Sequence, residues 1–193
     1  MKHFKKRDYG FTLLETLIVV AIMGVMAAIA TPSIISMLRN IRVNGAARNL
    51  FSDLMLAKFR AISENNKYII TFDINNNRYS IYDDNNNNGT ADSSELYKTV
   101  NIGTDSPDVR FGYVSGTIGV SGSAITSSVN FSGNPPKFYF KTDGTASDNG
   151  TAYFILSQDL TASSKDRMKA VTVITTGRIK SYRYKSSINP PWE

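Results

Sequence analysis

The sequence predicts an α+β protein, in which one long N-terminal helix packs on a domain of antiparallel β-strands. The helix is indicated by a predominantly apolar run over residues 11–30, and by apolar residues at three- and four-residue spacing from there to about residue 63. From residue 68 onward the apolar residues fall into short runs rich in Tyr, Ile, Val and Phe, which are typical of strands. The length of 193 residues suits one globular domain in addition to the helix.

The first ten residues form a short basic leader. It contains Lys2, Lys5, Lys6 and Arg7 against a single acid, Asp8. Basic residues next to a membrane-spanning segment stay on the cytoplasmic side. We therefore expect the leader to lie inside and the rest of the chain to lie outside.

The segment that follows the leader is predicted to enter a bilayer. Between Phe11 and Ala30 the only charged residue is Glu15. Twenty helical residues at about 1.5 Å of rise each span roughly 30 Å, the thickness of the hydrocarbon core. A carboxylate in such a segment costs about 2.5 kcal/mol or more, and such residues usually have a functional partner.

Other kinds of export signal remain open at this point. Ala28-Ile29-Ala30 before Thr31 also satisfies the small-x-small rule of a secretory signal peptide that is removed and discarded, and a plain single-pass anchor is a third possibility. Glu15 argues against a discarded signal peptide, because the apolar region of such a peptide has no use for an acid.

The residues around the start of the apolar run resemble those of type IV prepilins and of the pseudopilins of type II secretion systems. The similarity consists of a basic leader that ends in Gly10, followed by Phe11-Thr12-Leu13-Leu14-Glu15. The resemblance implies that a prepilin peptidase cuts between Gly10 and Phe11, that the Phe11 amine is N-methylated, and that the helix is retained. It also gives Glu15 a partner, since this amine, on the same or a neighbouring subunit, would pair with the carboxylate during assembly.

The resemblance implies an inner-membrane protein that later joins a fibre. Its expected partners are the prepilin peptidase, other pilin or pseudopilin subunits, and inner-membrane lipid before assembly. We divide the chain into a leader (1–10), a transmembrane half of the helix (11–34), an amphipathic half (35–64) and a periplasmic β domain (65–193). Pro32 is expected to bend the helix.

The β domain is expected to consist of one antiparallel sheet. Asn75-Asn76-Asn77 predicts a turn between the first two strands, and Thr175-Thr176-Gly177-Arg178 predicts a turn between the last two. The Gly-, Ser- and Thr-rich segment 115–132 is predicted to be an exposed loop. The strands are expected at Tyr68–Asp73, Arg78–Tyr82, Leu96–Ile102, Val109–Val114, Lys137–Lys141, Ala152–Ser157, Ala170–Thr175 and Arg178–Tyr184.

Two later segments are similar to the GspH/FimT group of minor pseudopilins. One is the aromatic strand that leads into a glycine turn, Phe138–Gly144, and the other is the strand, Gly-Arg, strand pattern over Ile174–Ile179. This resemblance covers most of the chain and weakens between residues 103 and 134.

Composition argues against an enzyme. The chain has no Cys and a single His, His3, which lies in the leader, so the processed protein would contain no His. This excludes Ser-His-Asp hydrolases and most zinc enzymes, and no phosphate-loop or nucleophile motif occurs. Removal of the leader leaves 18 basic and 15 acidic side chains, a net charge of +3 that requires no acidic partner.

A candidate calcium loop spans residues 84–95. Its sequence fits the twelve-residue template D-x-[DN]-x-[DN]-G-x5-E, in which Gly89 provides the sharp turn. An Asn-rich turn without any ion is the alternative, because the flanking residues are predicted strands rather than helices. The candidate ligands are Asp84, Asn86, Asn88, the Thr90 carbonyl, Asp92 and Glu95.

The last strand suggests DNA as an alternative partner. Tyr182 and Tyr184 alternate with basic residues there, a pattern suited to base stacking and phosphate contact. The commoner explanation is a solvated edge strand protected by basic side chains. The basic residues are Arg178, Lys180, Arg183 and Lys185.

Overall fold

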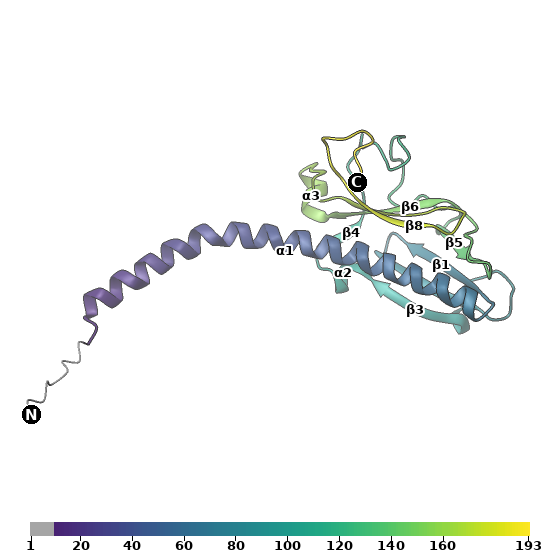
Figure 1. Cartoon of the computed structure of the whole chain (residues 1–193), viewed down its shortest axis with the longest axis horizontal. Helices are drawn as coiled ribbons and strands as arrows, with labels where there is room; N and C mark the ends of the chain where they lie inside the picture. Colours follow the sequence, from purple (N-terminus) through teal and green to yellow (C-terminus); the bar gives the residue numbers. More distant parts are fainter. Residues whose placement is uncertain (1–9) are drawn as a thin grey trace, which may run out of the picture. The chain divides into compact units, whose positions relative to one another are not determined.

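The structure is a computed structural model that describes residues 10–193 (Figure 1). The chain falls into two compact units, one up to Leu38 and one from Arg39 to Glu193. A single helix, α1 (Leu13–Ser63), accounts for the secondary structure of the first unit and continues into the second.

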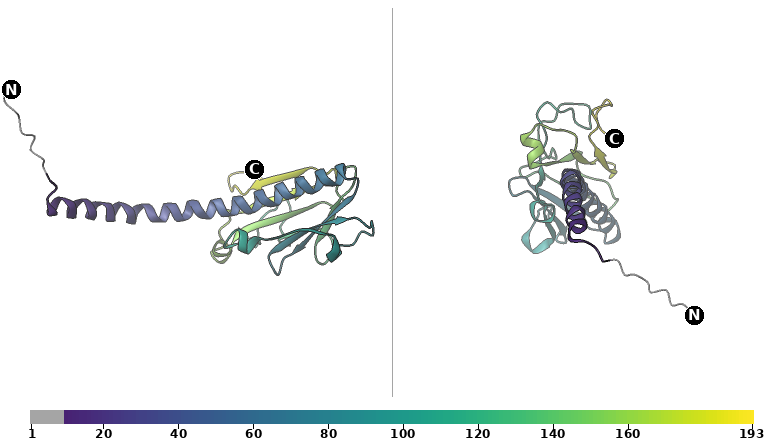
Figure 2. Two further views of the ribbon diagram at one scale, coloured as in Figure 1. Left: turned by 90° about the horizontal axis from the view of Figure 1, so that it is seen from below. Right: turned by 90° about the vertical axis from the view of Figure 1, so that its left-hand side faces the viewer.

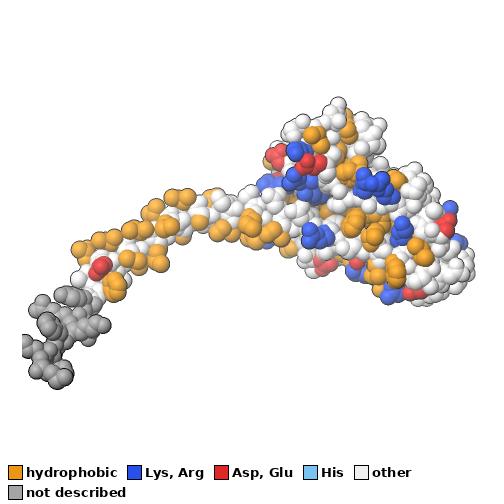
Figure 3. Space-filling model, in the orientation of Figure 1, with side chains coloured by type: hydrophobic (Ala, Val, Ile, Leu, Met, Phe, Trp, Pro, Cys, Tyr) orange, Lys and Arg blue, Asp and Glu red, His pale blue; other side chains and the backbone are white. Residues whose placement is uncertain are grey.

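In the first unit, Thr12 directly precedes α1, and its hydroxyl oxygen accepts a hydrogen bond from the backbone N–H of Glu15 (3.2 Å). This contact satisfies one of the free donors at the start of a helix. Every residue from Phe11 to Ile35 is exposed, including the large apolar side chains, and Figure 3 shows this stretch covered with hydrophobic groups. A helix that is apolar on all sides is normally covered by a membrane or by other protein.

In the second unit, α1 becomes amphipathic. The helix ends at Ser63, as the apolar spacing predicted, and Asn65 follows in a left-handed conformation (φ 52°) that Asn tolerates. Four of its buried residues are alanines, which allow the helix to approach the sheets closely. The buried apolar residues are Val43, Ala46, Ala47, Leu50, Leu54, Ala57 and Ala61.

The strands are antiparallel, as predicted, but they form two four-stranded sheets instead of one. The first sheet has the order β3-β2-β1-β5 and consists of β1 (Lys67–Asp73), β2 (Arg78–Asp84), β3 (Leu96–Asn101) and β5 (Lys137–Phe140). The second has the order β4-β6-β7-β8 and consists of β4 (Val109–Phe111), β6 (Gly150–Leu156), β7 (Lys169–Val173) and β8 (Ile179–Arg183). Both predicted hairpins, β1–β2 and β7–β8, are present.

Three short helical segments accompany the strands and were not predicted. They are η1 (Ser93–Glu95), α2 (Ile102–Asp105) and α3 (Ser157–Thr161). Each is a single turn, which is too short to give a helical period in the sequence.

One continuous core joins the C-terminal half of α1 to both sheets. Stacked phenylalanines occupy its centre, with ring centroids 4.4 Å apart for Phe131 and Phe138 and 5.4 Å apart for Phe131 and Phe72. A smaller cluster, which includes Tyr153 and Trp192, covers the opposite face of the second sheet. Strand β6 is therefore buried over its whole length.

The prediction of an exposed loop over residues 115–132 is wrong in part. Thr117 is buried, and Val129 and Phe131 belong to the main core. Gly150 lies against the Phe131 ring, since an added Cβ would come within 2.3 Å of it. Isolated apolar residues in a Ser- and Thr-rich segment give no periodic pattern, although they can anchor such a segment to a core.

Candidate functional site

The first candidate site is the start of α1. Residues 1–9, which hold most of the predicted basic leader, lie outside the described residues, and the structure begins at Gly10. Thr12 and Glu15 have the spacing of a capping box, and the Thr12 half of that motif is formed (3.2 Å). This local role of Thr12 was not predicted, although the T-x-x-E pattern indicates it.

The chemistry of Glu15 depends on whether the chain is cut. In the uncut chain the Phe11 nitrogen belongs to a peptide bond and carries no charge, whereas cleavage after Gly10 would turn it into an amine. Glu15 is exposed in the first turn of α1, among apolar side chains. Cleavage at Gly10, methylation of Phe11 and pairing with Glu15 stay predictions.

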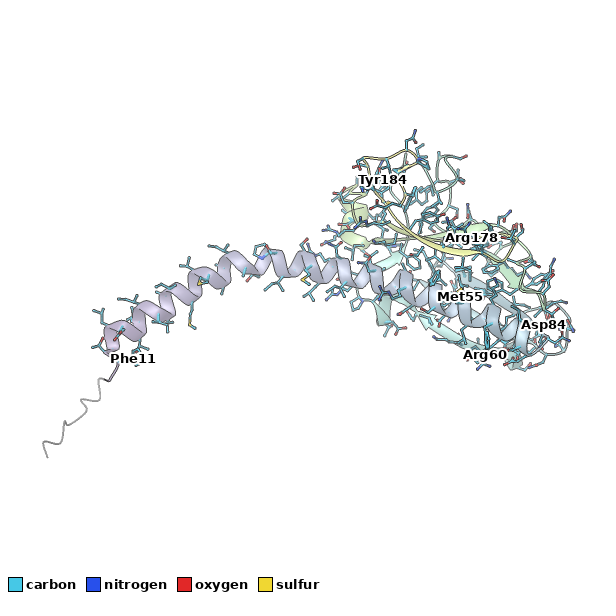
Figure 4. All side chains as sticks on the ribbon, in the orientation of Figure 1. Phe11, Met55, Arg60, Asp84, Arg178 and Tyr184 are labelled. Carbon is cyan, nitrogen blue, oxygen red and sulfur yellow. The ribbon has the colours of Figure 1, made fainter. Side chains whose placement is uncertain are left out.

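The second candidate site is the basic strand β8 and the residues after it. Figure 4 shows Arg178 and Tyr184 near the two ends of this segment. The Lys180 ammonium lies 5.7 Å from the centre of the Tyr182 ring, in a cation–π contact, and both residues line one shallow pocket with Arg178. This end of the strand thus combines two basic groups with an aromatic ring.

The other two basic residues of the segment are paired within the chain. Arg183 and Lys185 both form salt bridges with Glu193, with Lys185 Nζ 2.9 Å from the carboxylate. Hydrogen bonds from Lys185 and Arg183 hold the pKa of the Glu193 carboxyl below its usual value. Two of the four basic residues therefore already have an acidic partner within the chain.

An open groove of about 750 Å³ lies between α1 and β8, within the second unit. Figure 2 shows β8, in yellow, running beside the C-terminal half of the helix. The groove is lined by Arg48 from α1, Lys169 from β7 and Arg183 from β8, together with Glu193. Burial, and then the charge of Arg183, lowers the pKa of Lys169 to about 8. Sequence reasoning missed this groove because its basic residues come from separate parts of the chain.

The third candidate site is the loop from Asp84 to Glu95, which joins β2 to β3. Asp84 is fully buried and accepts hydrogen bonds from the backbone N–H of Gly89 at 3.3 and 3.1 Å. Gly89 has a positive φ of 74°, as the predicted sharp turn requires. Hydrogen bonds from Asn88, Thr90 and Asn86 lower the pKa of the Asp92 carboxyl.

The structure brings the predicted calcium ligands into one loop, but their carboxylates do not form an acidic cluster. Within residues 10–193, no group of three or more His, Cys, Asp or Glu side chains is arranged to hold a metal. A cation in this loop would depend on neutral oxygens as well as carboxylates, so calcium binding stays a prediction.

Two further buried acids have structural partners. Asp159 accepts two hydrogen bonds from Arg167, at 2.8 and 2.5 Å. Asp53 accepts hydrogen bonds from Tyr79 and Lys98, both at 2.7 Å. Both buried carboxylates thus have a basic partner within the chain, which offsets the cost of burying their charge.

Comparisons with known proteins agree with this architecture. The prokaryotic N-terminal methylation motif matches residues 5–31, and the type II transport protein GspH family matches residues 46–177. The structure of the minor pseudopilin EpsH from the type 2 secretion system of Vibrio cholerae has a TM-score of 0.52 at 10% identity, covering 74% of this chain and 97% of that chain.

Two further comparisons match parts of the chain. The type IV minor pilin FimU of Pseudomonas aeruginosa has a TM-score of 0.49 at 13% identity, covering 72% of this chain and 86% of that one. The type IV major pilin protein PilA of Myxococcus xanthus is 40% identical over 68 residues, which are 35% of this chain and 30% of PilA. The chain thus matches less than a third of the length of that curated relative.

An apolar helix that continues as the amphipathic support of an antiparallel β domain, and that begins with an N-terminal methylation motif, defines a pilin-like protein. The chain belongs to the type II transport protein GspH family, whose model matches about two thirds of it.

Proposed function

We propose that this protein is a minor pilin or pseudopilin, a structural subunit of a type IV pilus or of a type II secretion pseudopilus. Prepilin peptidase cleaves the precursor between Gly10 and Phe11, and the new Phe11 amine is methylated. The observation that carries the proposal is Glu15, the single acid between Phe11 and Ile35, a stretch in which every apolar side chain is exposed.

The exposed apolar surface of the N-terminal part of α1 is suited to two environments that the protein would occupy in turn. One 18-residue window of the helix has a mean hydropathy of 2.4, and none of that window is buried within the chain. Such a surface suits the inner membrane first, and the packed helices of a fibre afterwards. The basic leader would then face the cytoplasm and the β domain the periplasm.

Glu15 gives this surface a means of selecting one arrangement. In a dry bundle of helices an unpaired carboxylate is costly, and the amine that cleavage would create at Phe11 lies four residues before Glu15 in the sequence. Pairing with that amine, on the same or a neighbouring subunit, would favour one register between helices over the shifted alternatives.

The proposal is tested by replacing Glu15 with Ala in cells that assemble the fibre. The variant should still be cut, because the cleaved bond is unchanged, but it should enter the sheared fibre fraction at least about tenfold less than the wild type, since the pairing is lost. Thr16→Ala, at the neighbouring exposed position of the helix, is the matched control and should assemble normally. Normal assembly of Glu15→Ala would contradict the proposed role of Glu15.

Binding of DNA is a second candidate function, supported by the arrangement of Arg178, Lys180 and Tyr182 around one pocket. Phosphate contacts would make binding weaken as salt increases. In a gel-shift assay, Arg178→Gln combined with Lys180→Gln should reduce binding strongly, whereas Lys141→Gln should not. No shift, or a shift that is insensitive to salt, would remove this candidate.

A further inference from the structure

The loop between β2 and β3 buries negative charge without any basic partner. Asp84, at the end of β2, is fully buried, and Glu95, at the end of η1, is 7% exposed. No salt bridge within residues 10–193 includes either of them. Figure 4 shows Asp84 at the end of the domain where α1 finishes. Two buried carboxylates in one loop normally require a counter-charge.

The Glu95 carboxylate is the clearest sign that this loop lacks a binding partner. Its Oε1 atom accepts a hydrogen bond from the backbone N–H of Asn86 at 3.0 Å, which directs the carboxylate toward the loop. Its Oε2 atom is buried and has no hydrogen-bond partner, and among the described residues it is the only buried side-chain atom of this kind. Buried polar atoms without a partner are rare and call for an explanation, such as an ion.

The neutral oxygens of the loop suit a hard cation. The Asn86 side-chain oxygen accepts the backbone N–H of Asn88 at 2.9 Å, and the Asn88 oxygen accepts that of Thr90 at 2.7 Å. An amide oxygen has two lone pairs, so each can accept an N–H and still coordinate a metal. The Thr90 hydroxyl also contacts the Asn88 oxygen, at 2.6 Å, but it lies 2.9 Å from Asp92 Oδ1 as well. If it donates to Asp92, the Asn88 oxygen keeps a lone pair for a metal.

These atoms occupy the ligand positions of a twelve-residue calcium loop. In such a loop, positions 1, 3 and 5 supply side-chain oxygens, position 7 a carbonyl, position 9 often a water-mediated contact, and position 12 a bidentate Glu. Asp84 is at position 1, Glu95 at position 12, and Gly89, with its positive φ, at position 6. Asp92 at position 9 needs no direct contact, which explains how a site can exist without three clustered acids.

We propose that the Asp84–Glu95 loop binds one calcium ion, with Asp84, Glu95, the Asn86 and Asn88 amide oxygens and the Thr90 carbonyl as ligands. The free Oε2 of Glu95 distinguishes this site from an ordinary Asn-rich turn, which has no reason to bury an unpaired carboxylate oxygen. The bound ion ties the end of β2 to the start of β3. Because only two carboxylates bind directly, we expect a Kd of about 10⁻⁴ to 10⁻³ M.

The test uses the full chain in detergent micelles after treatment with EDTA. Isothermal titration with CaCl2 should give saturable heat. Thermal unfolding followed by circular dichroism should show a rise in Tm of about 3 to 10 °C in 10 mM CaCl2, with a smaller rise in 10 mM MgCl2, which prefers rigid octahedral sites. No saturable heat together with no change in Tm would overturn the proposal.

Variants locate the effect. Glu95→Gln and Asp84→Asn keep the side-chain shape and remove one ligand charge each, so both should lose most of the calcium-induced rise in Tm. Asp143→Asn, which alters an exposed acid in another turn, is the matched control and should keep the full rise. Retention of the full rise by Glu95→Gln, or its loss in Asp143→Asn, would contradict this assignment of the ion.

Discussion

Asp53 is the only buried acid among the residues of α1, and it links the helix to the first sheet. Its carboxylate accepts hydrogen bonds from the Tyr79 hydroxyl on β2 and from Lys98 on β3. Burial, and then the charge of Asp53, raises the pKa of Tyr79. The contact therefore joins three elements around one charge.

Replacement of Asp53 by Ala should lower the free energy of unfolding by about 2 to 4 kcal/mol, because it leaves the buried Tyr79 hydroxyl without an acceptor. Lys185→Ala, which removes an exposed ion pair with Glu193, should cost less than about 1 kcal/mol. Urea unfolding of the full chain in detergent micelles measures both values. Equal costs for the two variants would show that Asp53 has no special structural role.

Lys169 should make stability depend on pH. Its pKa falls from 10.5 to about 8 in the folded chain. Between these values the unfolded chain binds more protons at this side chain, so the free energy of unfolding rises with pH across the window. Below that window the folded chain bears the full cost of the half-buried charge beside Arg183.

Comparison with Lys169→Met isolates this effect, because the tyrosines titrate in both proteins. The free energy of unfolding of the wild type, relative to that of the variant, should increase from pH 8 to pH 10.5. A difference that stays constant over this range would contradict the lowered pKa of Lys169.

At the scale of elements, Gly177 controls how the β7–β8 hairpin meets α1. It has a φ of 75°, and an added Cβ would lie 1.9 Å from the Gly144 carbonyl oxygen. Its own carbonyl accepts a hydrogen bond from Lys58 of α1 at 2.8 Å. The hairpin turn, the turn at Gly144 and the helix are therefore in direct contact.

Gly177→Ala should destabilise the protein by at least about 2 kcal/mol, through the strained φ and the clash together. Gly116→Ala is the control, since Gly116 has a similar φ of 72° but no atom within 4 Å of an added Cβ. It should cost only about 1 kcal/mol. Equal losses for the two variants in denaturant unfolding would mean that the contact with Gly144 has no effect.

The sequence predicted most elements because their signals are local. The change of period after Asn66 marks the end of α1, and short apolar runs mark the strands. The division into two sheets was not predicted, since it depends on distant pairings such as Arg110 with Ile155. Phe131 joins the core from a segment without periodicity.

The same distinction applies to the candidate sites. The residues around Glu15 and the loop from Asp84 to Glu95 are continuous in sequence, so a template could find them. The groove lined by Arg48 and Lys169 is assembled by folding and was not found. Likewise, no pattern in the sequence shows that Glu193 pairs with Arg183 and Lys185.

At the scale of the whole molecule, the two units have different requirements. The second has its own core and needs no disulfide, since the chain contains no Cys. The first exposes the apolar side chains of its part of α1, and a helix that is apolar on all sides is normally covered by a membrane or by other protein. The proposed function depends on Glu15 and on the cut that gives it a partner.

The mature N-terminus tests this account most directly. Mass spectrometry of the protein from membranes and from sheared fibres should show a chain that begins with N-methylated Phe11. Gly10→Ala should block the cut, because the proposed cleavage site requires glycine directly before the cleaved bond. A mature chain that begins at Thr31, or one that retains Met1 in the assembled fibre, would contradict the account.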